Sequence, residues 1–142
     1  MKISEINEMI QNDSKVDMSN LAEESLRVIT LHGKYLGIWN EEKRMLLYLE
    51  NELNIIKKFK HEYYQGKCID EIYQNSPLQL KIPKQDLDVY LNSDKELSDI
   101  YFKYQRQKDK CDTIKMFIEQ NLNQRSHHFR NIIAFLNWTN GK

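Results

Sequence analysis

This chain of 142 residues contains few of the residues that break helices or cross-link a fold. It has only four glycines, two prolines and two cysteines, and its 21 basic residues balance its 21 acidic residues. The scarcity of glycine and proline favours long, uninterrupted helices. Cys68 and Cys111 lie far apart and lack a CxxC or Cys/His ligand pattern, so we expect two reduced thiols in a cytosolic protein.

Long apolar runs and catalytic motifs are also missing. No run approaches the roughly 18 apolar residues of a membrane-spanning helix, and the amino terminus has no hydrophobic secretory core. The GxxxxGK[ST] and GxGxxG phosphate patterns are absent, which argues against nucleotide hydrolysis. His127 and His128 are adjacent, so on a helix they point about 100° apart and chelate a metal poorly. We therefore expect no enzymatic activity, no metal and no cofactor.

Charge is segregated along this neutral chain. Residues 55–67 contain four basic residues and one acid, and residues 100–142 contain eight and three, whereas residues 1–54 and 68–99 carry an excess of acid. Such segregation indicates one surface suited to a polyanion and other surfaces that meet proteins or further copies of the chain. Ordinary solvated helix faces would produce the same pattern, so both interpretations stay open at this point.

The segment from Lys57 to Lys67 combines cations with aromatic rings. It contains four lysines, one histidine and three aromatic residues against a single acid. A single-stranded nucleic acid needs this combination, because cations can follow the phosphates while flat side chains accept unstacked bases. The candidate DNA-binding residues are Lys57, Lys58, Lys60, His61, Tyr63, Tyr64 and Lys67.

A structural role is the alternative for each of these residues. Cations suit the last turns of a helix, where they offset the helix dipole. Lys60 stands where the apolar stripe would place a hydrophobic residue, so it either snorkels from a packed stem or marks where the helix leaves its partner. Tyr63 or Tyr64 is a candidate for stacking on a base, and at least one of the two is expected in the core.

Apolar spacing predicts a mainly helical fold. A short helix is expected from Ile3 to Ile10, and a second helix begins near Asp17 or Ser19 and weakens at Gly37 and Asn40. A coiled-coil-type stripe then resumes and should pack against another helix. This stripe ends at Gly66, a suitable stop for a helix, and consists of Leu46, Leu49, Leu53, Ile56 and Tyr63.

The middle of the chain has an alternating pattern instead of a helical one. Two runs in which apolar and polar residues alternate are separated by residues 83–86, and this arrangement predicts a small β-hairpin. Because the region contains both prolines, the hairpin should be an edge structure or a loop. The apolar positions are Leu78, Leu80 and Ile82 in the first run and Leu87, Val89 and Leu91 in the second.

A long helix is predicted to follow. Ser93 and Glu96 form a capping box, and a near-heptad apolar stripe continues almost to the end of the chain. A helix of more than 40 residues cannot bury this stripe inside a monomer of this size, so it either breaks near residues 121–126 or packs against sister subunits; we expect both. The candidate oligomerisation residues are Leu97, Tyr101, Tyr104, Ile118, Leu122, Phe129, Ile132 and Leu136.

The basic-aromatic segment resembles that of UvsY, the recombination mediator family of T-even-like bacteriophages. The family order is basic-x-basic, acid-Tyr-Tyr, then Gly-basic. The resemblance extends to the helix start at residues 91–97, to Arg125-Ser126 with Phe129 and Ile132, and to the terminal Gly141-Lys142. This chain departs from the family pattern at Phe59 and His61, which replace small or aliphatic residues. The matching residues in the segment are Lys58, Lys60, Glu62, Tyr63, Tyr64, Gly66 and Lys67.

The resemblance implies a function and an assembly. UvsY-like mediators form ring-shaped homo-oligomers, here expected to be hexameric or heptameric, and they bind single-stranded DNA. They help a RecA-like (UvsX-type) recombinase displace the phage single-strand-binding protein and nucleate its filament, and they have no enzymatic activity. The resemblance places the protein in the host cell cytoplasm. The alternative function is a non-catalytic helical adaptor that oligomerises and binds only proteins.

The expected architecture follows from these patterns together. Residues 1–142 should form a single domain of long helices packed as an antiparallel or coiled-coil hairpin, with a minor β-hairpin. Residues 1–67 would hold the N-terminal helices and the DNA-binding segment, and residues 68–92 would form the connecting loop or hairpin. Residues 93–142 would form the long oligomerisation helix.

Overall fold

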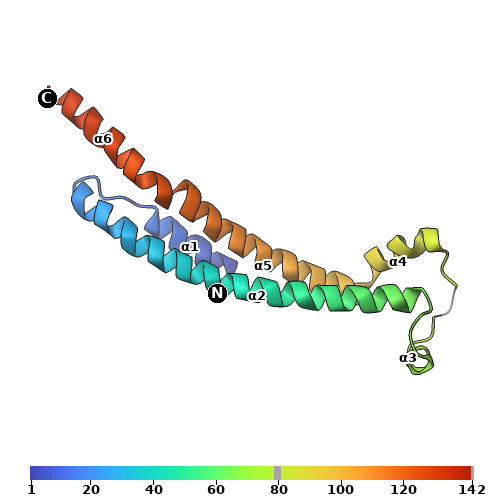
Figure 1. Cartoon of the computed structure of the whole chain (residues 1–142). Helices are drawn as coiled ribbons and strands as arrows, with labels where there is room; N and C mark the ends of the chain where they lie inside the picture. Colours follow the sequence, from blue (N-terminus) through green and yellow to red (C-terminus); the bar gives the residue numbers. More distant parts are fainter. Residues whose placement is uncertain (79–80, 142) are drawn as a thin grey trace. The chain divides into compact units, whose positions relative to one another are not determined.

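The protein is mainly helical, as predicted. The computed structural model describes residues 1–78 and 81–141, and every regular element among them is a helix. No helix in this described part is both long and apolar enough to span a membrane. In chain order the elements are α1 (Ile3–Asp13), α2 (Leu21–Tyr64), α3 (Asp70–Asn75), the 3-10 helix η1 (Lys84–Asp86), α4 (Leu87–Ser93), α5 (Lys95–Gln120), the 3-10 helix η2 (Leu122–Gln124) and α6 (Arg125–Thr139) (Figure 1).

The chain groups into two compact units. Unit 1 consists of residues 1–43 together with the described residues from 109 onward, and unit 2 consists of residues 44–108. Helices α2 and α5 each contribute one part to unit 1 and another part to unit 2. Both ends of the chain therefore build unit 1, and the middle of the chain builds unit 2.

Helix α2 runs for 44 residues without a break, so the weakening expected at Gly37 and Asn40 does not interrupt it. An interior glycine costs a helix only about 1 kcal/mol relative to alanine, which packing on either side easily offsets. The helix stops near the expected Gly66, whose φ of 74° is the left-handed conformation that glycine tolerates. The backbone N–H of Lys67 donates to Glu62 (3.0 Å) and that of Gly66 to Tyr63 (3.1 Å), which satisfies the last carbonyl groups.

The core of unit 1 joins α1, α2, α5 and η2. Ile6 of α1, Tyr35 of α2 and Ile114 of α5 are fully buried, and the Tyr35 and Phe117 rings lie 4.6 Å apart between their centroids. The Tyr35 hydroxyl donates to Asp13 at the end of α1 (2.7 Å). Helix α1 is therefore held to α2 both by apolar packing and by a hydrogen bond at its last residue.

The C-terminal stripe is divided among three helices. Helix α5 ends at Gln120, and η2 separates it from α6 within the range 121–126. The guanidinium of Arg125, the first residue of α6, is buried and donates to the backbone carbonyl of Asp13 (2.6 Å) and to the side chain of Asn121 (2.9 Å). The turn at η2 thus places Arg125 against the end of α1.

The predicted β-hairpin is wrong in its second run. Residues Leu87, Val89 and Leu91 belong to the helix α4, in which Leu87 and Leu91 are buried one turn apart while Val89 is exposed. In the first run, Leu78 and Ile82 have no regular structure, and Leu80 lies outside the described residues. A three-position alternation fits a helix equally well, because its first and last members lie four residues apart on one helical face.

The long helix also begins differently from the prediction. Ser93 is the last residue of α4, where its hydroxyl donates to the Val89 carbonyl, so it does not cap α5. Asp94 takes that role, because its carboxylate accepts the backbone N–H of Leu97 (2.9 Å). One residue therefore both ends α4 and begins α5.

Candidate nucleic-acid interface

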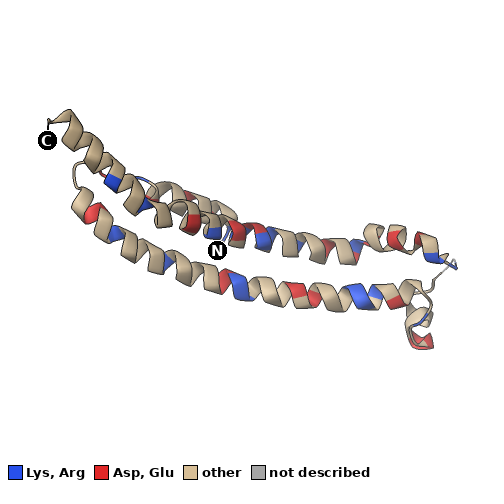
Figure 2. Ribbon diagram, turned by 45° about the horizontal axis from the view of Figure 1, so that its top comes forward, with Lys and Arg blue, Asp and Glu red and all other residues tan. Residues whose placement is uncertain are grey.

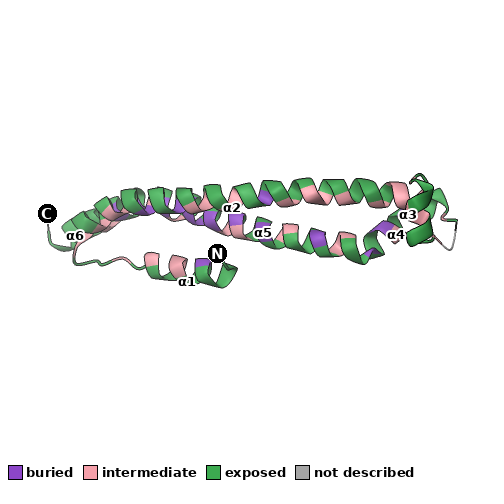
Figure 3. Cartoon of the chain, turned by 90° about the horizontal axis from the view of Figure 1, so that it is seen from below, coloured by how far each residue is buried: buried purple, intermediate pink, exposed green. Residues whose placement is uncertain are grey.

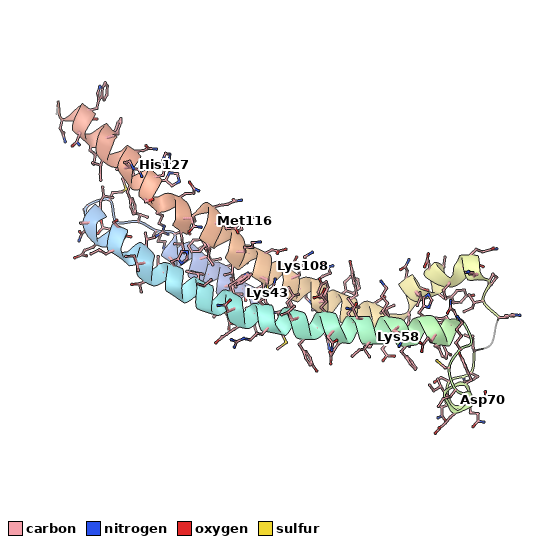
Figure 4. All side chains as sticks on the ribbon, viewed as in Figure 1. Lys43, Lys58, Asp70, Lys108, Met116 and His127 are labelled. Atoms are coloured by element: carbon pink, nitrogen blue, oxygen red, sulfur yellow. The ribbon has the colours of Figure 1, made fainter. Side chains whose placement is uncertain are left out.

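The C-terminal end of α2 and the residues just after it present a group of exposed basic side chains in unit 2. Lys57, Lys58, His61 and Lys67 are all exposed, and none of the three lysines forms an ion pair with another described residue. Figure 2 shows Lys and Arg gathered near this end of α2, and Figure 4 labels Lys58 there. We call the three lysines the α2 cation group. Their charges are available to an external anion.

Lys60 differs from the α2 cation group because its ammonium is paired inside unit 2. Its Nζ lies 3.3 Å from a carboxylate oxygen of Asp94 and 3.0 Å from one of Glu96, and its side chain is 14% exposed. Burial alone would lower the pKa of Lys60, but Glu96 and Asp94 together raise it above its ordinary value. The charge of Lys60 is therefore used to hold α2 against the start of α5.

Asp94 is the centre of this arrangement. Its nearly buried carboxylate accepts the Tyr64 hydroxyl (2.6 Å) and the Leu97 backbone N–H (2.9 Å) in addition to pairing with Lys60. Burial would raise the pKa of Asp94, but the hydrogen bonds from Tyr64 and Leu97 and the Lys60 ammonium outweigh it and hold the pKa below its ordinary value. Burial and the neighbouring carboxylate in turn raise the pKa of Tyr64 well above the usual range. Nothing in the local sequence around Lys60 indicated this partner.

Both tyrosines of the motif have structural partners. The Tyr63 hydroxyl donates to the Ser76 carbonyl (3.0 Å), and its ring stacks on Tyr73 with 5.4 Å between centroids and 19° between planes. The Tyr64 ring lies 5.9 Å from that of Tyr90. Both residues are half-buried. The remaining aromatic residue of the segment, Phe59, is 40% exposed.

The candidate oligomerisation residues separate into two sets. Ile118, Leu122 and Phe129 are buried inside this single chain, so they pack unit 1 and offer no surface to a second copy. Leu97, Tyr104 and Ile132 are half-buried, and Tyr101 and Leu136 are exposed.

Sequence reasoning missed the largest exposed apolar residues of α6. Phe135 is 63% exposed and Trp138 is 78% exposed, and Figure 3 shows the later part of α6 almost entirely as exposed surface. The signal was the high apolar density of residues 132–138, which occupies more than one helical face and so cannot all belong to a single stripe.

A metal site has no support in the described part of the chain, which contains no group of three or more His, Cys, Asp or Glu side chains able to hold an ion. His127 and His128 are both exposed on α6, and His127 contacts Asn131 (3.3 Å). The features of the described residues that are best able to bind a ligand are therefore the α2 cation group and the exposed aromatic residues.

Comparison with known proteins places these features in a family context. A family model described as recombination, repair and ssDNA binding protein UvsY matches residues 9–142. Two crystal structures of the bacteriophage T4 recombination mediator protein UvsY have the same fold. The lattice type II structure has a TM-score of 0.87 at 17% identity and covers 98% of both chains. The lattice type IV structure has a TM-score of 0.79 at 16% identity and covers 98% of this chain and 99% of the other. No curated protein sequence matches this chain.

Proposed function

Because this chain belongs to the UvsY family of recombination, repair and ssDNA-binding proteins, we propose that it is a recombination mediator that binds single-stranded DNA. In this role it promotes the loading of a RecA-like recombinase onto strands covered by single-strand-binding protein, during homologous recombination and recombination-dependent replication or repair. The observation that carries the proposal is the α2 cation group, whose three lysines are exposed and have no ion-pair partner among the described residues.

The α2 cation group contacts phosphates, and the paired residues of the segment hold it in place. Lys57, Lys58 and Lys67 can each neutralise a phosphate without reading sequence, which suits a protein that must load strands of any sequence. Lys60 and Tyr64 act indirectly, because their contacts with Asp94 fix the end of α2. Of the residues that the sequence suggests for DNA binding, the exposed ones therefore make the contacts.

Self-association multiplies these weak contacts. Phe135 and Trp138 leave α6 with more exposed apolar surface than solvent favours, and contact with a second copy would cover it. A ring of six or seven subunits would present many copies of the α2 cation group to one strand, so that individually weak phosphate contacts add by avidity. The recombinase and the single-strand-binding protein are the further partners of this ring.

Fluorescence anisotropy of a labelled single-stranded oligonucleotide tests the proposal. The Lys57→Ala/Lys58→Ala variant should bind more weakly than wild type, and the slope of log K against log salt should become shallower by about 0.7 for each phosphate contact removed. The matched control is Lys108→Ala/Lys115→Ala, which removes the same charge from exposed positions of α5. Light scattering should give the same mass for all three proteins.

One outcome would count against the mediator function and another against the proposed site. If the wild-type protein fails to retain DNA even at low salt, the adaptor that binds only proteins becomes the better description. If both double variants weaken binding equally, the effect reflects net charge and the α2 cation group is not the site. Recombinase loading itself is measured as the rate of recombinase filament formation on DNA already coated with single-strand-binding protein, with and without this protein.

A further inference from the structure

Unit 2 contains a groove beside the α2 cation group. It lies among α2, α4 and the start of α5 and has a volume of about 430 Å³. Leu53, Leu91 and Leu97 contribute its apolar surface, and Tyr101 and Phe102 of α5 line it as well. A volume of this size is within the range of small-ligand sites, which are roughly 300 to 1,000 Å³.

The two aromatic residues of the groove are exposed. Tyr101 is 46% exposed and Phe102 is 59% exposed, and their ring centroids lie 6.0 Å apart with 62° between the planes. Within the described part of the chain each ring has only the other as an aromatic neighbour. In contrast to Tyr63, which stacks on Tyr73, these rings retain accessible surface for a planar ligand.

The charge of the groove points to a ligand attached to phosphate. Lys57 is the only charged side chain among the residues that line it, and it also belongs to the α2 cation group. Asn92 and Ser98 add polar groups at the same groove. One site therefore combines an unpaired cation, exposed aromatic rings and hydrogen-bonding side chains, which is the set that an unstacked base and its phosphate require.

We propose that this groove receives an unpaired base of the bound single strand, with the base against Tyr101 and Phe102 and its phosphate at Lys57. The inference rests on the proposed function and adds to it a base-stacking site outside the basic-aromatic segment. It assigns base stacking to Tyr101 and Phe102 of α5 and not to Tyr63 and Tyr64, whose partners lie within the chain. It also gives Tyr101 a role on the DNA in place of one between subunits.

The test compares two labelled oligonucleotides of the same length, oligothymidylate and a strand of abasic sites. The two strands carry the same phosphates, but only the first has bases to stack. Wild-type protein should bind oligothymidylate more tightly than the abasic strand. In Tyr101→Leu/Phe102→Leu, which keeps apolar side chains but removes the rings, oligothymidylate binding should weaken by about fivefold or more while abasic binding is unchanged. Tyr48→Leu is the matched control, because Tyr48 is an exposed aromatic residue of unit 2 outside the groove.

Each other result has a definite meaning. If the leucine variant binds oligothymidylate as wild type does, or loses both strands equally, the stacking site is refuted while phosphate binding by the α2 cation group still stands. A fall in mass by light scattering would instead assign Tyr101 and Phe102 to a subunit contact. If wild type binds neither strand, the proposed function fails and the stacking site fails with it.

A measurement on the wild-type protein alone guards against a leucine variant that does not fold. An oligonucleotide containing 2-aminopurine loses fluorescence when that base stacks on an aromatic ring. Binding of the wild-type protein should therefore quench it. Binding without quenching would overturn the proposal.

Discussion

Replacing Lys60 with methionine tests whether this cation stabilises unit 2 or binds DNA. Methionine keeps an unbranched apolar side chain of similar length, so the packing of the stem is largely retained while the charge is removed. The charge lost is the one whose Nζ lies 3.3 Å from Asp94 and 3.0 Å from Glu96. The variant is therefore expected to be less stable and to bind single-stranded DNA nearly as well as wild type.

The size of the stability loss follows from the surroundings of the two carboxylates. The Glu96 side chain is 66% exposed, so its pairing with Lys60 contributes only about 0 to 1 kcal/mol. The Asp94 side chain is 7% exposed, and losing a charged partner there is costly. Asp94 nevertheless keeps its hydrogen bonds from Tyr64 and Leu97. We therefore expect a loss of about 1 to 3 kcal/mol, less than for a fully orphaned buried charge.

Urea denaturation followed by circular dichroism measures this loss, at one protomer concentration because self-association stabilises the folded chain. Lys58→Met is the matched control: Lys58 is exposed and forms no ion pair with a described residue, so its stability should change by less than about 0.5 kcal/mol. The order should reverse for DNA, with Lys58→Met weakening binding more than Lys60→Met. A Lys60→Met protein as stable as wild type, or one that loses more DNA affinity than Lys58→Met, would refute the reasoning.

Four further predictions concern stability. Gly33→Ala should stabilise the protein by about 0.5 to 1 kcal/mol, because a Cβ there meets nothing within 4 Å and alanine favours the helix. Gly66→Ala should instead destabilise it by roughly 1 to 2 kcal/mol, because a φ of 74° is strained for alanine. The two variants should therefore shift the melting temperature in opposite directions. Leu122→Ala should cost about 2 to 4 kcal/mol in urea denaturation, because that side chain is 2% exposed in the core of unit 1, and a loss below about 1 kcal/mol would contradict this packing. Folding lowers the pKa of Asp94 below its ordinary value of 3.8, so the ionised carboxylate contributes its full stabilisation above pH 3.8. That stabilisation is lost as the pH falls through the lower pKa of the folded state. The difference in unfolding free energy between wild type and Asp94→Asn should therefore shrink in acid.

The sequence predicts the start of α1, the end of α2 and the start of α5 to within two residues, because the signals for these helix ends are local. The spacing from Ile3, the stop at Gly66 and the restart near Ser93 each depend on residues within one or two turns. The hairpin error has a local cause too. Leu87, Val89 and Leu91 are too few to separate a period of two from a period of 3.6, and the structure buries only the pair four residues apart.

The site is harder to predict because its partners are distant in sequence. Lys60 and Tyr64 both contact Asp94, which lies 30 residues after Tyr64 in the sequence. No motif around α2 indicates which lysine is paired and which is exposed. The groove has the same origin, since Lys57 lies on α2 while Tyr101 and Phe102 lie on α5. Composition identified a basic and aromatic segment, but only the packing of α2 against α5 separates the residues with partners inside the chain from those still available.

Because unit 1 is built from two separate segments of the chain, it can fold only after unit 2 has been synthesised. Residues 44–108 leave the ribosome as one continuous piece, and all of unit 2 is then present. Residues 1–43 emerge earlier but lack the other half of their core until Ile114, Phe117 and Leu122 have followed. The hydrogen bond between Arg125 and Asp13 joins residues 112 positions apart, a contact that cannot form until residue 125 has been synthesised. Residues 1–43 are thus made before unit 2 but complete their packing only after unit 2 is present, the reverse of the usual N-terminal-first order.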